Sequence, residues 1–193
     1  MQSETAERIL QTANALLIDR GYSAFSYADI ADAVQIRKAS IHYHFPTKAG
    51  LVVAVLQAHR GRILEGMEAL DRRFSNPLTR LREYFKFWEG CIADQTLSFC
   101  VGALLSAEMP SLPEEVQAEV RQHFATLTRW FEATLKAGVR AGEIKLPGKV
   151  DTEAQVLIAS MHGAMLSARA TRSCDVFRAV SHAVLARITP AKK

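Results

Sequence analysis

The apolar positions of this chain recur every three to four residues almost throughout, which predicts a protein built of helices. In the first predicted helix, Ile9, Ala13 and Leu17 share one face, and Gly21 suits its C-terminal end. No alternation typical of β-strands, no repeat and no low-complexity tract is visible. The pattern therefore predicts an all-α fold.

Two short helices joined by a tight turn are predicted within residues 26–45. Ser26 is a good N-cap for the first of them, and Asp29, three residues on, can complete a capping box. Pro46 cannot continue the second helix, and Thr47 suits the N-cap of the next one. This arrangement predicts a helix-turn-helix, followed by a long third element.

The second short helix has two different faces. Ile41 and Phe45 are four residues apart and so share an apolar face. A step of about 100° per residue places the other side chains opposite or beside that face; they are Ala39, Ser40, His42 and Tyr43, with Arg37 and Lys38 at the N-terminal end. Residues 33–64 contain no acidic residue. A short, acid-free helix with a cationic start is what insertion into the major groove of DNA requires.

Further helices are predicted over residues 48–73, 78–94, 100–108, 113–142 and 151–172, with a last one after 174. Asp151 and Asp175 are the expected N-caps of the final two. The long helix over residues 48–73 is expected to connect an N-terminal part to a C-terminal part. Residues 1–47 and 48–193 are therefore the predicted domains.

The composition of the chain indicates the cellular compartment in which the protein is expected. The chain has 193 residues, a net charge of +4 and only three cysteines, with no CxxC spacing, which argues against a disulfide framework or a zinc site. The N-terminus is polar and acidic, unlike a signal peptide. The longest apolar run, residues 51–56, is far shorter than the roughly 20 residues of a membrane span. We expect a cytoplasmic protein.

Several motifs in residues 5–60 resemble the TetR family of one-component bacterial transcription regulators, above all Ser40-Ile-His-Tyr-His-Phe-Pro-Thr-Lys. The resemblance implies a helix-turn-helix DNA-binding domain, a C-terminal effector-binding and dimerisation domain, and repression relieved at a palindromic operator. The family usually has Gly at the position of Gln35. The expected DNA-binding residues are Ser26, Tyr27, Arg37, Lys38, Ala39, Ser40, His42, Tyr43, His44, Thr47 and Lys48. His44 also suits a packed or capping role.

The last two predicted helices carry small and apolar residues that suit close helix packing. Such faces can pack inside one subunit, but the resemblance implies a homodimer through these helices. The expected interface consists of Ser160, Gly163, Ala164, Ser167, Phe177, Val180 and Val184.

The middle helices are rich in large and soft side chains, most of which belong to a core. The resemblance implies that a small apolar or electrophilic effector binds among them. The candidate pocket residues are Phe85, Trp88, Cys91, Phe99, Cys100, Leu104, Glu108, His123, Phe124, Leu127, Trp130, Phe131, Met161, His162 and Met165.

Cys100 is a candidate redox sensor. The segment that begins Ser98-Phe-Cys-Val-Gly resembles a branch of the family whose members sense electrophiles or oxidants through a cysteine. A helix N-terminus near Cys100 would lower the pKa of its thiol. The alternative is a small buried hydrophobic residue.

Two other classes of protein are considered. A thiol enzyme would pair Cys100 with His123 or His162, but no nucleophile elbow, phosphate loop or metal-ligand cluster is visible. An architectural DNA-binding protein would have no effector. We expect no enzymatic activity, no cofactor, no metal and no membrane partner.

Overall fold

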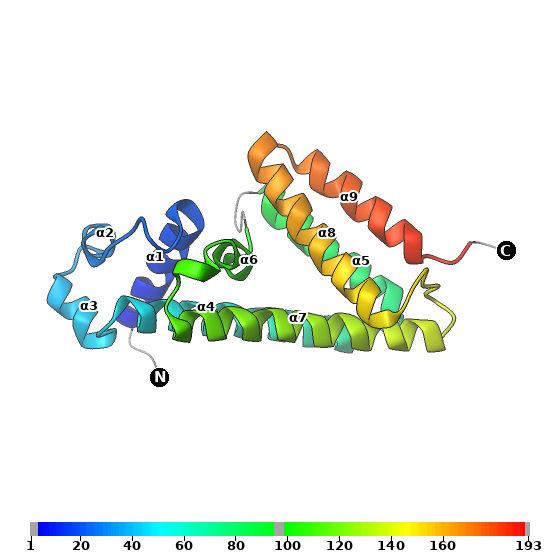
Figure 1. The fold of residues 1–193 in the computed structure, drawn as a ribbon, viewed down its shortest axis with the longest axis horizontal. Helices are drawn as coiled ribbons and strands as arrows, with labels where there is room; N and C mark the ends of the chain where they lie inside the picture. The colour runs from blue at the N-terminus through cyan, green and yellow to red at the C-terminus, as the bar shows by residue number, and fades with distance from the viewer. Residues whose placement is uncertain (1–3, 95–98, 192–193) are drawn as a thin grey trace. The chain divides into compact units, whose positions relative to one another are not determined.

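The computed structural model describes residues 4–94 and 99–191, and it is helical without strands in these ranges (Figure 1). This confirms the predicted all-α fold. Ser98 lies outside the described residues. The elements are α1 (Glu4–Arg20), α2 (Tyr27–Val34), α3 (Lys38–His44), α4 (Lys48–Arg73), α5 (Pro77–Ala93), α6 (Val101–Ser106), the 3-10 turn η1 (Met109–Ser111), α7 (Glu114–Arg140), α8 (Val150–Thr171) and α9 (Cys174–Ile188).

The chain packs as two compact units. The first unit contains residues 1–62 and 100–124, and the second contains residues 63–99 and 125–193. Helices α4 and α7 therefore each contribute to both units. The predicted functional boundary at residue 47 stays a prediction, but the packing boundary differs from it, because the first half of α4, α6 and the start of α7 share a core with α1–α3.

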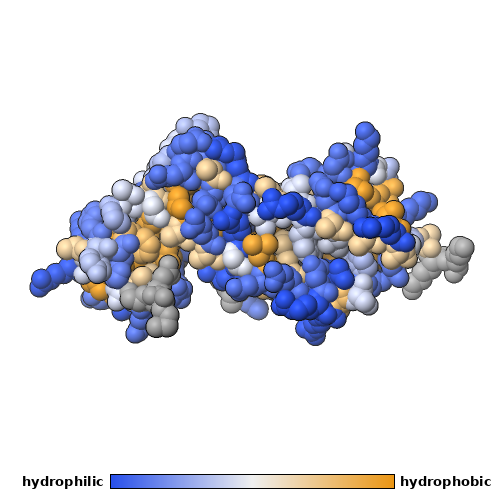
Figure 2. Space-filling model, turned by 90° about the horizontal axis from the view of Figure 1, so that it is seen from below, coloured by the Kyte–Doolittle hydropathy of each residue, from blue (hydrophilic) through white to orange (hydrophobic). Residues whose placement is uncertain are grey.

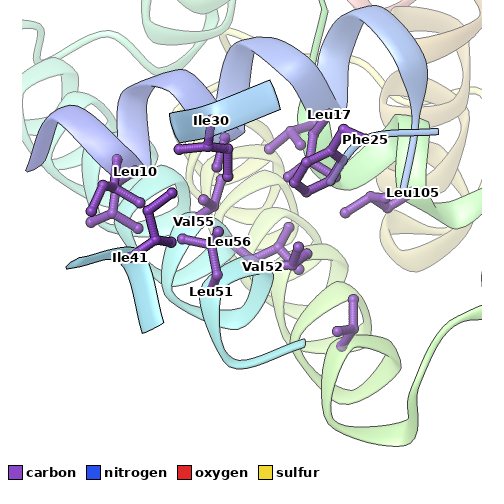
Figure 3. Close-up of a cluster of buried hydrophobic side chains, with 14 of the residues drawn as sticks. Leu10, Leu17, Phe25, Ile30, Ile41, Leu51, Val52, Val55, Leu56 and Leu105 are labelled. Carbon is purple, nitrogen blue, oxygen red and sulfur yellow. The ribbon is translucent and has the colours of Figure 1, made fainter. Parts of the chain in front are cut away.

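The first unit is built around a single apolar core (Figure 3). Leu17 of α1, Ile30 of α2 and Ile41 of α3 are each 0% exposed. Leu51 and Val52 of α4 and Leu105 of α6 complete this core at the same exposure. Burying one such side chain is worth about 1.5–3 kcal/mol, so the core holds the short helices α2 and α3 that could not form alone.

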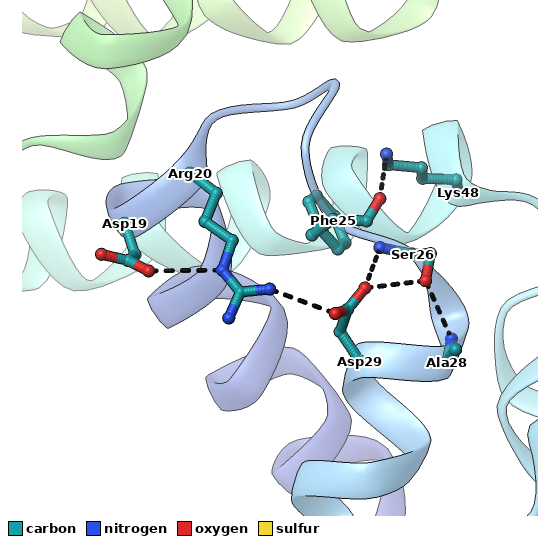
Figure 4. Close-up of polar contacts among 7 residues, drawn as sticks. All are labelled: Asp19, Arg20, Phe25, Ser26, Ala28, Asp29 and Lys48. Carbon is teal, nitrogen blue, oxygen red and sulfur yellow. Dashed lines mark hydrogen bonds and ion pairs between the residues drawn. The ribbon is translucent and has the colours of Figure 1, made fainter.

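The ends of the short helices are set by local hydrogen bonds. The backbone N–H of Ser26 donates to Asp29 Oδ2 at 2.7 Å, and the backbone N–H of Ala28 donates to Ser26 Oγ at 3.2 Å (Figure 4). The predicted capping box is therefore confirmed. At the start of α4, the N–H of Gly50 donates to Thr47 Oγ1 at 3.0 Å, as expected for an N-cap.

Two expected caps are wrong by two residues. Helix α8 begins at Val150 with Lys149 as its N-cap, and Asp151 lies inside the first turn. Helix α9 begins at Cys174, and its N-cap is Ser173, whose hydroxyl accepts a hydrogen bond from the N–H of Asp175. Acidic residues are favourable throughout a first turn as well as at the cap, so the sequence alone does not separate the two positions.

The second unit packs α5 against α8 and α9, and α8 runs beside α9 (Figure 1). Its interior contains an aromatic cluster: the rings of Tyr84 and Trp130 lie 5.2 Å apart, as do those of Trp130 and Phe131. Phe85 and Phe177 are buried in the same unit. Among the described residues, no helix is long and apolar enough to cross a membrane. Hydrophilic residues cover most of the face shown in Figure 2.

Candidate nucleic-acid interface and an adjoining buried cluster

Helix α3 presents the two faces that the periodicity predicts. Ile41 is 0% exposed, and Phe45 packs against the core of the first unit. On the other side, Tyr43 is 84% exposed. Within residues 37–44, Arg37, Lys38, Ala39 and His42 of the expected DNA-facing set are also exposed, whereas Ser40 and His44 are half-buried. An apolar face anchors this helix while a polar face stays accessible.

The accessible face of α3 has free positive charge. Within the described residues, the side chains of Arg37 and Lys38 form no ion pair and no hydrogen bond. Both are exposed, and no acidic residue lies between positions 33 and 64. Arginine and lysine in such a setting suit phosphate oxygens, which position a protein on DNA.

Tyr27 and Lys48, both expected to contact DNA, are engaged inside the protein. The Tyr27 hydroxyl donates to the carbonyl of Phe45 at 2.7 Å, and burial raises the pKa of Tyr27 to about 12. Lys48 Nζ donates to the carbonyl of Phe25 at 2.5 Å (Figure 4). It also lies over the rings of Tyr22 and Phe25. These two bonds tie the start of α2 to the end of α3 and to the start of α4.

The polar partners of α2 reinforce the same arrangement. Hydrogen bonds from Ser26 lower the pKa of Asp29, and Arg20 at 3.1 Å adds to this shift (Figure 4). The ring of His42 lies 4.7 Å from that of Tyr27, and its Nδ1 is 3.4 Å from the carbonyl of Pro46. Ser26 and Thr47 are exposed, so their caps do not remove them from the surface.

The first unit also contains a buried cluster of two histidines and one cysteine. Cys100 Sγ lies 3.2 Å from His123 Nε2 and 3.5 Å from His59 Nε2. His59 comes from α4, Cys100 is the N-cap of α6, and His123 comes from α7. His59 was not among the expected site residues, since no local pattern distinguishes it from other histidines.

The thiol of Cys100 differs from the expected sensor thiol. Burial raises its pKa to about 11, and the backbone N–H groups of Gly102 and Ala103 oppose this shift only in part. The expectation of a lowered pKa is therefore wrong: the helix N-terminus acts in the predicted direction, but desolvation is the larger effect. The side chain is 1% exposed.

Glu108 connects the neighbourhood of α6 to the connection between α1 and α2. Its carboxylate oxygens accept the backbone N–H of Tyr22 at 3.0 and 3.2 Å. Gly21 has φ +78°, a conformation that favours glycine, and a Cβ built there would lie 2.5 Å from Glu108 Oε1, so a larger residue would also push the carboxylate away. Glu108 was expected to line an effector pocket, whereas in the structure its carboxylate accepts hydrogen bonds from a backbone N–H.

The remaining expected pocket residues fall into both units. Leu104 and Phe124 are half-buried in the first unit. In the second unit, Trp130 is half-buried and its Nε1 donates to Asp71 at 3.2 Å. Burial lowers the pKa of His162 to about 4. The other expected pocket residues in the second unit are all buried; they are Phe85, Trp88, Cys91, Phe99, Leu127, Phe131, Met161 and Met165.

A surface groove of about 730 Å³ lies in the second unit between α5 and α9. Its lining includes the polar and charged residues Arg82, Lys86, Glu89 and His182 beside apolar ones such as Leu185. Of the expected effector residues in the described chain, only Phe85 lines it. This groove therefore does not correspond to the predicted apolar pocket.

The expected interface residues on α8 and α9 differ in accessibility. Gly163 and Ser167 are exposed, and Ser160 and Val180 are half-buried. A Cβ built on Gly163 would meet nothing within 4 Å. Ala164, Phe177 and Val184 are 3, 0 and 6% exposed, because they pack inside their own unit.

These features describe a helix-turn-helix with an accessible face on α3, and comparisons with known proteins assign the family of the chain. Residues 9–55 match the model of bacterial regulatory proteins of the tetR family, and residues 77–184 match that of the tetracyclin repressor-like C-terminal domain. A TetR family regulator from Agrobacterium tumefaciens is 47% identical, with a TM-score of 0.94, over 96% of this chain and 98% of that one.

A second relative has both a curated sequence and a solved structure. The HTH-type transcriptional repressor NemR of Escherichia coli (strain K12) is 25% identical over 98% of this chain and 97% of its own length. The reduced form of E. coli NemR has a TM-score of 0.85, over 98% of this chain and 100% of that one. The repressor DhaR of Mycobacterium sp. (strain GP1) is 26% identical over 86% of this chain and 83% of its own length.

The chain belongs to the TetR family. It is accordingly a DNA-binding transcription regulator and not an enzyme. Regulators of this family bind operator DNA and small-molecule effectors and act as dimers. Two pairings were considered for a thiol enzyme. The structure places Cys100 beside His123, whereas His162 belongs to the other unit.

Proposed function

We propose that the protein is a cytoplasmic repressor that binds a pseudo-palindromic operator as a homodimer and is released by a small-molecule effector. The observation that carries this proposal is the division of α3: Ile41 is 0% exposed while Tyr43 is 84% exposed. Each subunit would insert α3 into one major groove, with half-site centres about one helical turn or a multiple apart.

The roles of the residues follow from their exposure and bonding. Arg37 and Lys38 would contact phosphates, because their charges are exposed and not engaged in ion pairs within the described chain. Ser40 and His42 would read base edges, and Tyr43 would reach a phosphate oxygen. Tyr27 and Lys48 instead position α2 and α3, since their polar atoms already bind Phe45 and Phe25.

We place the dimer interface on the accessible parts of α8 and α9. Gly163, Ser167, Ser160 and Val180 retain surface that a partner can cover, and the small side chains on α8 allow close helix approach. Ala164, Phe177 and Val184 are left out of this interface, because they have almost no surface to offer.

Operator binding can be tested by footprinting the region upstream of the chain's own gene. A protected pseudo-palindrome supports the proposal, and uniform weak protection supports an architectural protein. In Arg37→Ala/Lys38→Ala, the homodimer loses four phosphate contacts, two in each subunit, so the slope of log affinity against log salt should fall by about 3.6, at about 0.9 for each contact. Lys86→Ala, an exposed lysine of the second unit, is the matched control. An unchanged slope in the double variant would contradict the placement of the DNA-facing surface.

The dimer can be tested with Gly163→Phe. A Cβ at this exposed position meets nothing within 4 Å in its own subunit, so the substitution should weaken the dimer and the operator affinity together without unfolding the chain. Gly66→Phe is the control, since Gly66 is an exposed helical glycine with equally open surroundings. Sedimentation that finds an intact dimer for Gly163→Phe would remove α8 from the interface.

A further inference from the structure

Three metal-ligating side chains from separate parts of the sequence meet inside the first unit. The ligand atoms of His59, Cys100 and His123 all lie within 4.8 Å of one another. The residues are 4, 1 and 1% exposed. Since the ligands come from α4, from the start of α6 and from α7, the cluster forms only when these helices pack together.

The distances fit a metal site. With bonds of about 2.0–2.1 Å to nitrogen and about 2.3 Å to sulfur, ligand atoms at tetrahedral or trigonal angles are about 3.3–3.8 Å apart. The two sulfur–nitrogen distances of 3.5 and 3.2 Å are close to this range. Both histidines point Nε2 at the sulfur, and all three ligand atoms lie within 4.8 Å of one another, so drawing them together would let one cation contact all three.

Gly102 makes room for one of these ligands. A Cβ built at Gly102 would lie 2.5 Å from Cδ2 of the His123 ring. Any larger residue at this position would displace the imidazole from Cys100. The close packing of a glycine against His123 therefore keeps Nε2 beside the thiol.

We propose that His59, Cys100 and His123 bind one Cu(I) ion per chain. On binding, the Cys100 thiol loses its proton to solvent, one sulfur–copper bond and two nitrogen–copper bonds form, and copper stays Cu(I), so no electron is transferred. Thiolate and imidazole are ligands that copper prefers. One thiolate and Cu(I) give a neutral complex, whereas a divalent ion would leave a buried positive charge, which is costly. Among the described residues, no carboxylate belongs to this ligand group.

The cluster is connected to the DNA-reading elements by two hydrogen bonds. Helix α4, which carries His59, begins with Lys48, and Lys48 binds the carbonyl of Phe25. The segment that follows Cys100 ends in Glu108, which binds the N–H of Tyr22. Tyr22 and Phe25 both lie in the connection between α1 and α2, so these two hydrogen bonds fix that connection. Drawing the three ligands onto one ion would therefore move the supports of α2 and α3, and we expect operator affinity to fall. This coupling rests on the proposed repressor function.

Metal binding is tested without DNA. Wild-type protein is titrated anaerobically with Cu(I) in competition with bicinchoninate, and thiolate-to-copper absorption in the near ultraviolet is followed. We expect one Cu(I) per chain. Cys100→Ser and His59→Gln should each lower the affinity at least about 100-fold, more than the 10–100-fold typical of losing an outer-shell partner. Cys174→Ser, a half-buried cysteine of the second unit, should bind as the wild type does. Urea unfolding of each variant establishes that it is folded.

The outcomes separate the site from its effect. Equal Cu(I) affinity in folded wild type, Cys100→Ser and His59→Gln would overturn the site. Tight Zn(II) binding without Cu(I) binding, or alkylation of Cys100 by N-ethylmaleimide in a protein that binds no copper, would overturn the Cu(I) assignment. In an operator titration, Cu(I) should weaken wild-type binding at least about tenfold, a typical allosteric effect, and leave Cys100→Ser unchanged. Failure of the metal-free protein to bind the operator would instead contradict the proposed function and leave the metal titration valid.

Discussion

Histidines occur in two contrasting places within the first unit. His42 is exposed on α3, and His44 at the end of the same helix is half-buried. His59 and His123 are 4 and 1% exposed and face a thiol. In the functions proposed above, the same type of side chain contacts DNA in one place and binds a cation in the other, and its burial separates the two uses.

The two places also differ in what holds them. The exposed side chains Arg37 and Lys38 need no internal partner, because solvent reaches them, and the helix is held by the buried Ile41, by Phe45 and by the bond from Tyr27 to the Phe45 carbonyl. A buried imidazole must instead meet hydrogen-bonding or metal-ligating groups, since an unsatisfied polar group in the interior costs about 1–3 kcal/mol. The interior site is therefore defined by three helices at once.

The largest effect is expected from the apolar side of α3. Ile41→Ala should lower the free energy of unfolding by about 3 kcal/mol, because it removes a fully buried aliphatic side chain and leaves a cavity. Tyr43→Ala, on the exposed side, should change stability by less than about 0.5 kcal/mol but weaken operator binding. Urea unfolding and fluorescence anisotropy with operator DNA measure the two quantities. A stable Ile41→Ala or a destabilised Tyr43→Ala would refute the division of faces.

The accessible face could be predicted from the sequence because its information is local. In a helix with 3.6 residues per turn, Ile41 and Tyr43, two positions apart, fall on opposite faces. The capping box of Ser26 and Asp29 spans only four residues. The uses of Lys48 and Tyr27 could not be predicted, since their acceptors lie 23 and 18 residues away in sequence. The periodicity shows that such side chains are near the surface but not whether they turn inward.

The buried cluster was beyond sequence reasoning for the same reason. His123 is 23 residues and His59 is 41 residues from Cys100, and neither separation matches a metal-binding motif. The pKa of Cys100 was predicted in the wrong direction, because the helix N-terminus is visible in the sequence but burial is not. The packing of α4, α6 and α7 decides both.

A buried histidine in the second unit allows the cost of burial to be measured. Burial lowers the pKa of His162 from 6.5 to about 4, so between these values the unfolded chain binds a proton that the folded chain does not. Stability contributed by neutral His162 is complete above pH 6.5 and is lost as pH falls toward 4, by at most about 3 kcal/mol. From pH 7 to pH 5 we expect a loss of about 2 kcal/mol.

Urea unfolding at pH 7 and pH 5 checks this expectation. His162→Gln should remove most of the pH dependence, whereas His182→Gln should retain it, because His182 is exposed on α9. Equal pH dependence in wild type and His162→Gln would show that the buried imidazole is not the group that titrates.

The smallest expected effect concerns the turn that sets the angle between α2 and α3. Gln35 has φ 59° and ψ 48°, a left-handed conformation that costs a residue with a Cβ about 1–2 kcal/mol. Its side-chain amide donates to the carbonyl of Asp32 at 2.7 Å, an exposed bond of small net value. Gln35→Gly relieves the conformational cost but adds backbone entropy to the unfolded chain, so we expect the free energy of unfolding to rise by about 0.5–1 kcal/mol.

The control is Gln35→Ala, which loses the same amide and keeps the Cβ, so it should be slightly destabilised. The difference in stability between the two variants isolates the cost of the left-handed backbone conformation. A shift of the urea midpoint at constant slope is the measurement, and operator affinity should stay unchanged because the exposed face of α3 is untouched. If Gln35→Gly were no more stable than Gln35→Ala, the left-handed turn would not be strained, and the orientation of α3 would depend on the Tyr27 and Lys48 bonds instead.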